Sequence, residues 1–133
     1  MSLEALRSVP IFESLSDDAL QRILDRCNEF EAQPGHVLVA PNLPGSGLFV
    51  IEEGKVTVDL RGRVVELGPG EFFGELALLD EGAVHSGRVC AETAVKCLAI
   101  RRDDFAEMMD SEPQIVRAML KVLARRLSTA VGA

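Results

Sequence analysis

The sequence predicts an α+β domain in which a sandwich, roll or barrel of short strands is flanked by helices at both ends. Residues 16–27 and residues 113–129 carry apolar side chains at helical spacing. Between these segments, residues 28–101 form short β-rich runs that Gly and Pro separate, as strands and tight turns require. Short strands at such regular spacing are typical of closed or two-layered β folds.

The N-terminal helix has a clear capping sequence. Ser16 is expected to act as the N-cap, and the carboxylates of Asp17 and Asp18 suit the positive end of the helix dipole. The apolar positions that follow recur every three or four residues and are Ala19, Leu20, Ile23, Leu24 and Cys27. Residues 3–7 are expected to add one or two helical turns.

The central region reads as a series of strands. Residues 48–51 are apolar throughout, which indicates a strand buried on both faces. Residues 55–60 alternate with period two, and Gly62 is expected to turn the chain into a returning strand at residues 64–67. A further pair of strands is predicted at residues 87–90 and 94–100.

The C-terminal third returns to helical patterns. Residues 102–109 predict a short helix, and Pro113 suits the first turn of a longer one. A 4-3-4-3 spacing on the longer helix is typical of a coiled-coil seam, and its members are Val116, Leu120, Leu123, Leu127 and Ala130. A second apolar stripe consists of Ile115, Met119 and Val122. The pattern predicts a homodimer through this helix, and the alternative is that both stripes pack against the domain's own core.

The charge distribution argues against nucleic acid as a partner. The 133 residues carry a net charge of −7, from 14 basic and 21 acidic side chains. A polyanion must be met by a basic face. From Gln114 to the end there are four basic residues and no acidic one. A solvated helix face explains that basic cluster without a nucleic-acid ligand.

The sequence predicts a cytoplasmic protein that does not enter a membrane. No apolar run reaches the roughly 18 residues that a membrane span needs, and the N-terminus lacks the pattern of a signal peptide. The three cysteines, Cys27, Cys90 and Cys97, form no CxxC motif and are expected to be reduced and buried. Cys90 and Cys97 could also face each other across a hairpin.

Catalytic motifs are absent from the sequence. His36 and His85 are the only histidines, and neither belongs to an HxH or HExxH motif, so we expect no metal site. The chain contains no phosphate-binding GxxxxGK[ST] loop and no GxSxG nucleophile elbow. The sequence therefore predicts a binding module rather than an enzyme.

The most informative stretch is residues 72–89, FFGELALLDEGAVHSGRV. It reads as a glycine, a short helical run, a loop and a strand. A glycine at a helix start lets backbone N–H groups approach an anion, and the helix dipole favours negative charge there. Glu75 in that first turn could equally be a simple helix cap.

This stretch closely resembles the phosphate-binding cassette of cyclic-nucleotide-binding domains, as in catabolite-activator-type regulators, protein kinase A regulatory subunits and gated channels. The resemblance extends over nearly the whole chain, at residues 9–16, Pro34-Gly35, residues 48–56, residues 67–75 and residues 124–127. It implies an antiparallel β-roll of the double-stranded β-helix or jelly-roll type, with N-terminal helices, a short cassette helix and C-terminal helices. The division would be residues 1–27, 28–101 and 102–133, with no DNA-binding helix-turn-helix within the chain.

The resemblance also implies a role for each cassette position. Gly74 would lie near the ribose, and Glu75 would accept a hydrogen bond from the ribose 2′-hydroxyl. The remaining expected ligand contacts are Leu76 and Ala77 at the pocket wall, Ser86 and Gly87 at the phosphate, and Val64 and Leu67 at the base.

Two positions depart from the family pattern. His85 stands where the family usually places an arginine, whose bidentate fork pairs with the cyclic phosphate. Arg88 is a doubtful substitute, because strand alternation puts it on the face opposite His85. The bacterial regulators also read adenine with a Thr-Ser pair, where this chain has Ala130 and Val131.

Two hypotheses follow. In the first, the domain senses a cyclic nucleotide, cAMP or cGMP, and relays binding through its C-terminal helix to an effector protein or domain. In the second, the fold has lost its nucleotide and serves as an interaction or dimerisation module. Gly74, Glu75 and Ser86 favour the first hypothesis, and His85 favours the second.

Overall fold

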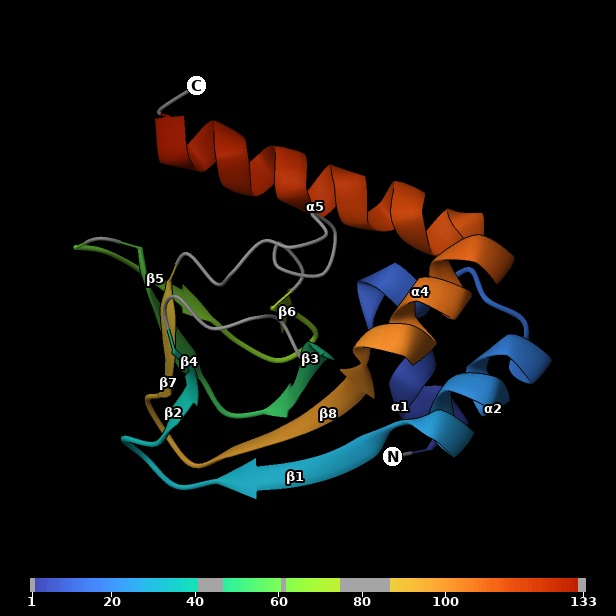
Figure 1. The fold of residues 1–133 in the computed structure, drawn as a ribbon, viewed down its shortest axis with the longest axis horizontal. Helices are drawn as coiled ribbons and strands as arrows, with labels where there is room; N and C mark the ends of the chain where they lie inside the picture. The colour runs from blue at the N-terminus through green and yellow to red at the C-terminus, as the bar shows by residue number, and fades with distance from the viewer. Residues whose placement is uncertain (1, 41–46, 61, 75–86, 132–133) are drawn as a thin grey trace.

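The computed structural model describes residues 2–40, 47–60, 62–74 and 87–131. The elements run from N-terminal helices through two four-stranded sheets to a long C-terminal helix (Figure 1). All strand pairs in both sheets are antiparallel and are given by the ladders β1·β8, β2·β7, β3·β6, β3·β8, β4·β5 and β4·β7. The predicted antiparallel roll with helices at both ends is confirmed. The predicted short cassette helix falls on residues 75–86, outside the described residues.

Three short helical segments open the chain, α1 (Leu3–Arg7), η1 (Pro10–Phe12) and α2 (Asp17–Arg26). The hydroxyl of Ser16 accepts a hydrogen bond from the backbone N–H of Ala19 at 3.2 Å, which confirms the predicted cap of α2. One face of α2 is buried against the rest of the helical region.

The strands form two sheets whose orders are β1-β8-β3-β6 and β2-β7-β4-β5. The first sheet contains β1 (Asn28–Ala32), β8 (Val95–Arg101), β3 (Gly47–Glu53) and β6 (Phe72–Phe73). The second contains β2 (Val37–Val39), β7 (Arg88–Ala91), β4 (Val56–Leu60) and β5 (Arg63–Leu67). β4 and β5 are consecutive in the chain, whereas all other neighbouring strands come from distant parts of the sequence. The 72–89 stretch begins in β6 of the first sheet and ends in β7 of the second.

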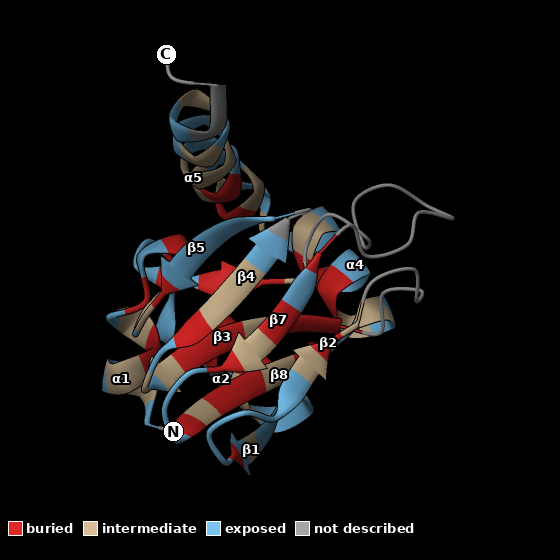
Figure 2. Ribbon diagram, turned by 90° about the vertical axis from the view of Figure 1, so that its left-hand side faces the viewer, coloured by how far each residue is buried: buried red, intermediate tan, exposed pale blue. Residues whose placement is uncertain are grey.

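Because successive side chains of the first sheet point to opposite faces, the sheet contributes to two separate hydrophobic cores. Leu48 and Val50 of β3 face the helices, whereas Ile51 belongs to the cluster between the two sheets. Every strand contributes at least one side chain to this inter-sheet cluster, whose buried members are Ala32, Val39, Ile51, Val56, Leu67, Phe73, Val89, Ala91, Val95 and Cys97. Among the strands, β3 and β8 carry the most buried residues, interrupted by half-buried ones, whereas β5 is mostly exposed (Figure 2). The interior of the roll is thus a second core, separate from the helical one.

Two helices close the chain, α4 (Arg102–Ser111) and α5 (Pro113–Val131). Ile115 and Met119 of α5 are fully buried in the helical core, and Val122 packs against it. Leu120 and Leu127 are 61% and 64% exposed. The second predicted apolar stripe therefore packs on the domain, while part of the predicted seam faces outward. Within the described residues, no helix has the length and apolarity of a membrane span.

Candidate functional site

Near its start, the cassette passes through a backbone position that strongly favours glycine. Gly74 follows β6 with a φ of +91°, in the left-handed region that other residues rarely adopt. A Cβ at this position would lie 2.8 Å from the carbonyl oxygen of Gly47 and 3.3 Å from the ring of Phe49. Both the conformation and the close approach of β3 therefore require glycine, and they fix the point from which the cassette leaves the sheet.

An aromatic cluster lies directly under this position. The rings of Phe49 and Phe73 are stacked, with centroids 5.1 Å apart and an interplanar angle of 20°. Phe30 packs edge-on against Phe49 at 5.8 Å. Such aromatic pairs contribute roughly 0.5–1.5 kcal/mol beyond the area that they bury. The backbone at Gly74 thus lies against a packed aromatic cluster.

The other end of the cassette enters β7 through Gly87, which is buried. Arg88 is the first residue of β7; it is exposed and lies opposite Asp59 of β4. Val89 points the other way, into the inter-sheet core. Arg88 therefore lies on the outer face of the second sheet, and its placement gives no support to a phosphate contact.

The two predicted base contacts on β5 lie on opposite faces of that strand. Leu67 pairs with Val56 and is 6% exposed in the inter-sheet core, whereas Val64 pairs with Asp59 and is 62% exposed. They cannot both face the interior of the roll. Val65 pairs with Val58, shares the inner face with Leu67 and is 39% exposed. Sequence analysis missed Val65, although alternation counted back from Leu67 would have found it.

The C-terminal helix is attached to the strand that leads into the cassette. Arg126 of α5 donates a hydrogen bond through Nη2 to the carbonyl oxygen of Phe72 at 2.6 Å. Its guanidinium also lies 4.5 Å from the centroid of the Phe72 ring, in cation–π geometry. Phe72 is two residues before Gly74. This contact was not predicted, because it joins residues 54 positions apart in the sequence.

Comparison with known proteins decides the family. A family model described as "Cyclic nucleotide-binding domain" matches residues 29–112. The chain belongs to the cyclic nucleotide-binding domain family. The resemblance in the cassette sequence is thereby confirmed at the level of the family.

Individual relatives and solved structures agree with this assignment. A cyclic nucleotide-gated potassium channel of Mesorhizobium japonicum is 33% identical over 98% of this chain and 36% of its own length. A CRP-like cAMP-activated global transcriptional regulator of Mycobacterium tuberculosis is 31% identical over 93% of this chain and 58% of its own length. The crystal structure of the Thermus thermophilus catabolite activator protein superimposes with a TM-score of 0.76 at 30% identity, over 91% of this chain and 59% of that one. The chain thus spans only part of each of these relatives.

Five predicted ligand residues of this cyclic nucleotide-binding domain lie outside the described residues. They are Glu75, Leu76, Ala77, His85 and Ser86. The described residues supply the two ends of the cassette, residues 72–74 and 87–89, and the aromatic cluster beside its start. The roles of the five residues remain those that the family resemblance implies.

Of the three cysteines predicted to be buried, Cys97 is buried, whereas Cys27 and Cys90 are only half-buried. Burial raises the pKa of Cys97 to about 11, with a further contribution from the negative charge of Glu52. Cys97 lies in the first sheet and Cys90 in the second, and both are free thiols. Among the described residues, no group of three His, Cys, Asp or Glu side chains is placed to share a metal ion.

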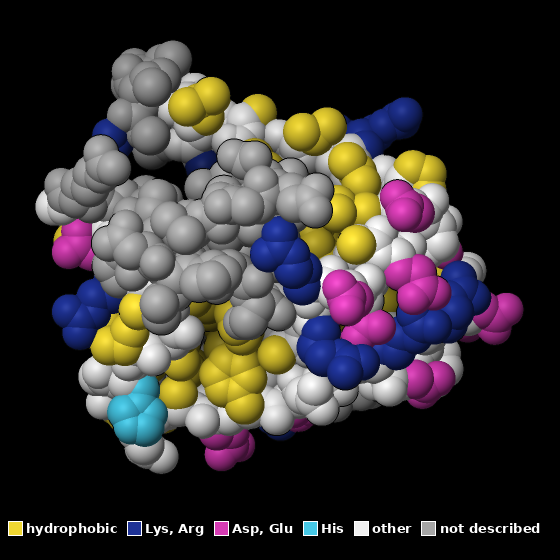
Figure 3. Space-filling model, in the orientation of Figure 1, with side chains coloured by type: hydrophobic (Ala, Val, Ile, Leu, Met, Phe, Trp, Pro, Cys, Tyr) yellow, Lys and Arg dark blue, Asp and Glu magenta, His cyan; other side chains and the backbone are white. Residues whose placement is uncertain are grey.

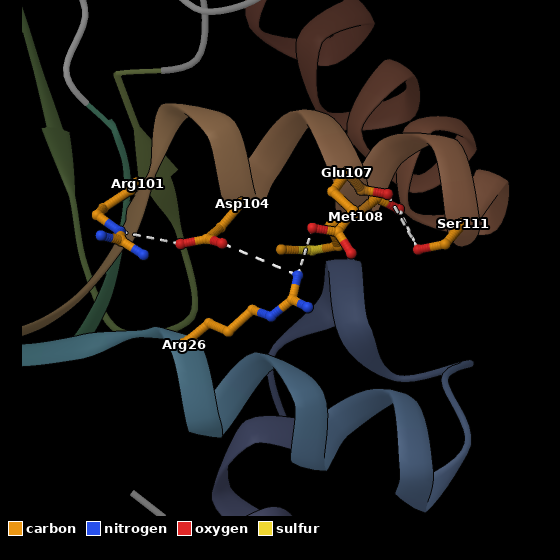
Figure 4. Close-up of polar contacts among 6 residues, drawn as sticks. All are labelled: Arg26, Arg101, Asp104, Glu107, Met108 and Ser111. Carbon is orange, nitrogen blue, oxygen red and sulfur yellow. Dashed lines mark hydrogen bonds and ion pairs between the residues drawn. The ribbon is translucent and has the colours of Figure 1, made fainter.

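A groove between α2 and α4 lies on the helical side of the domain. Arg26 of α2 forms ion pairs across it with Glu107 at 2.5 Å and with Asp104 at 3.9 Å, and Arg101 binds Asp104 at 3.0 Å (Figure 4). The hydrogen bond with Glu107 raises the pKa of Arg26 further above its usual range. These paired charges explain the groove as a connection between the N-terminal and C-terminal helices, so we assign it no ligand.

Proposed function

We propose that this domain is a regulatory sensor that binds a cyclic nucleotide, cAMP or cGMP, at the 72–89 cassette and relays binding through α5. The observation that carries the proposal is the enforced glycine geometry at Gly74, immediately before Glu75, in a chain of the cyclic nucleotide-binding family. Calorimetric titration of the chain with cAMP and with cGMP tests it directly. We propose no catalytic role.

In this proposal the cassette supplies the polar contacts and the roll supplies the apolar ones. Glu75 accepts a hydrogen bond from the ribose 2′-hydroxyl, and the hydroxyl of Ser86 and the N–H of Gly87 donate to the phosphate. Leu76 and Ala77 line the pocket. On β5, the inner-face position of Val65 makes it a better candidate for a base contact than Val64.

Phosphate recognition is the weak point of the proposed site. A neutral imidazole at His85 offers one donor and no charge, where an arginine would offer a charged fork. On the described strand Arg88 faces outward beside Asp59 and does not replace that fork. The proposal therefore predicts binding weaker than an arginine at position 85 would give.

The relay from the site to α5 has a structural basis in Arg126. This side chain contacts Phe72, which lies two residues before Gly74, so a shift of the cassette start changes a contact of the helix. An effector protein or domain that reads the position of α5 would receive the signal.

We also propose that α5 forms a homodimer. Leu120 and Leu127 are one heptad apart and largely exposed, and hydrophobic side chains emerge along this helix on the face shown in Figure 3. Leu123, between them, is only partly buried against the helical core. A second copy of α5 would cover these positions.

The alternative is a domain that has kept the fold and lost the nucleotide. The substitution of His85 for the usual arginine favours it. In that case the exposed seam of α5 would be the functional surface. Absence of any heat of binding with both cAMP and cGMP would make this alternative the better one.

A further inference from the structure

The long helix α5 is attached to the domain in two different ways along its length. Its first half is held by apolar burial, because Ile115 and Met119 lie fully inside the helical core. Beyond Leu123, none of the side chains from Ala124 to Thr129 is buried. Among the described residues, buried apolar side chains therefore do not hold this second half in place.

In the part of the chain that the structure describes, two arginine–carbonyl contacts attach this second half to the strands. One is the hydrogen bond from Arg126 to the carbonyl oxygen of Phe72. The other runs in the opposite direction: Arg63, at the start of β5, donates through Nη2 to the carbonyl oxygen of Thr129 at 2.9 Å. The second contact joins the β4–β5 hairpin to the last turn of the helix, 66 positions later in the sequence.

The chemistry of the helix end suits this donor. The last four carbonyl groups of a helix have no partner within the helix, and Thr129 is third from the end of α5. The same end carries partial negative charge, which a guanidinium stabilises. Arg63 thus gives the helix a cap from a distant strand.

We propose that Arg63 is a positioning residue that holds the last turn of α5 on the β4–β5 hairpin. The hairpin and the helix end then move together. Because β5 also carries Val65 and Leu67 on its inner face, a ligand inside the roll would act on the helix end through this strand. The last step rests on the proposed function, whereas the positioning role itself does not require a ligand.

Hydrogen exchange of the free protein tests the positioning role without nucleotide. In Arg63→Gln, amides in the last turn of α5 should exchange about two- to fivefold faster than in the wild type, the range expected for the loss of one exposed hydrogen bond. Amides around Ile115 and Met119 should be unchanged. Arg63→Lys, which keeps one charged donor, should restore part of the protection.

Arg125→Gln is the matched control. Arg125 is exposed in the same half of α5, and its substitution removes the same charge. Equal exchange in Arg63→Gln and the wild type, or equal acceleration in Arg63→Gln and Arg125→Gln, overturns the proposal.

Addition of cAMP separates this proposal from the proposed function. If the wild type binds, cAMP should change exchange in both the hairpin and the last turn of α5, and Arg63→Gln should lose the change in the helix only. If Arg63→Gln keeps both exchange changes on addition of cAMP, the coupling between the hairpin and the helix end is contradicted. If no binding occurs, the proposed function fails, and the result on the free protein still decides the role of Arg63.

Discussion

A Cβ atom at Gly74 would lie 2.8 Å from the carbonyl oxygen of Gly47, closer than real Cβ contacts allow. Gly74 is the last residue of the cassette that is described before residues 75–86, and Gly47 is the first residue of β3, an inner strand of the first sheet. The start of the cassette is therefore set by contact between two backbone segments, and side-chain packing from Phe49 and Phe73 supports it.

Alanine should lower the free energy of unfolding more at position 74 than at Gly62, a glycine with the same backbone conformation. Gly62 has the same φ of +91° as Gly74, but a Cβ there would meet nothing within 4 Å. Gly62→Ala should lower the free energy of unfolding by about 1 kcal/mol through backbone strain alone. Gly74→Ala adds the clash with β3 and should cost about 2–4 kcal/mol. Urea denaturation measures both, and equal losses would show that the close approach to Gly47 is unimportant.

The exposed leucines of α5 should control association. A Leu120→Glu, Leu127→Glu double variant should remain folded, because both side chains are more than half exposed, and it should sediment as a monomer. The wild type should sediment as a dimer at the same concentration. A wild type that is monomeric at high micromolar concentration rules out the proposed homodimer.

Glu52 should make the stability of the domain depend on pH. Burial raises the pKa of this carboxyl, the negative charge of Glu29 adds to the increase, and Lys96 at 3.9 Å offsets only part of it. The folded state therefore holds the proton to a higher pH than the unfolded state does. Above the unfolded pKa, the ionised carboxylate is a cost to folding that grows as pH rises through the folded pKa and then stays constant.

Glu52→Gln should therefore increase the free energy of unfolding at neutral pH, and the gain should vanish in acid. The exposed neighbour Glu53 provides the control, since Glu53→Gln should change stability by less than about 0.5 kcal/mol. Thermal unfolding of the three proteins across the acidic range measures the effect. A Glu52→Gln variant that is less stable than the wild type at neutral pH would show that the ion pair with Lys96 dominates.

Local patterns in the sequence were sufficient to predict the helices and most strands, but they left a sandwich, a roll and a barrel open, and only the family resemblance implied the roll. The cap at Ser16 and the helix start at Pro113 depend on neighbouring residues, and the structure confirms both. Alternation predicted the strands of the β4–β5 hairpin, but the prediction chose Val64 as well as Leu67 and so mixed the two faces of β5. Alternation counted back from Leu67 gives Val65, which shares its face, in place of Val64.

Contacts between distant segments could not be predicted from the sequence. Arg63 and Arg126 each reach a backbone carbonyl more than fifty positions away, and a carbonyl group leaves no signature in the residue type. For the same reason, the sequence could not show which apolar stripe of α5 is buried against the domain and which is exposed. Only the fold shows that Ile115 and Met119 are buried and that Leu120 and Leu127 are exposed.

The central claim is that the cassette binds a cyclic nucleotide despite His85. One titration calorimetry experiment, with cAMP added to the wild type and to His85→Arg, tests it most directly. A charged hydrogen bond to the phosphate contributes roughly 1.5–3 kcal/mol, so the arginine variant should bind about 10- to 150-fold more tightly. Measurable binding by the wild type and tighter binding by His85→Arg is the predicted result. Absence of binding by both proteins would contradict the account, and equal affinities would show that residue 85 does not face the phosphate.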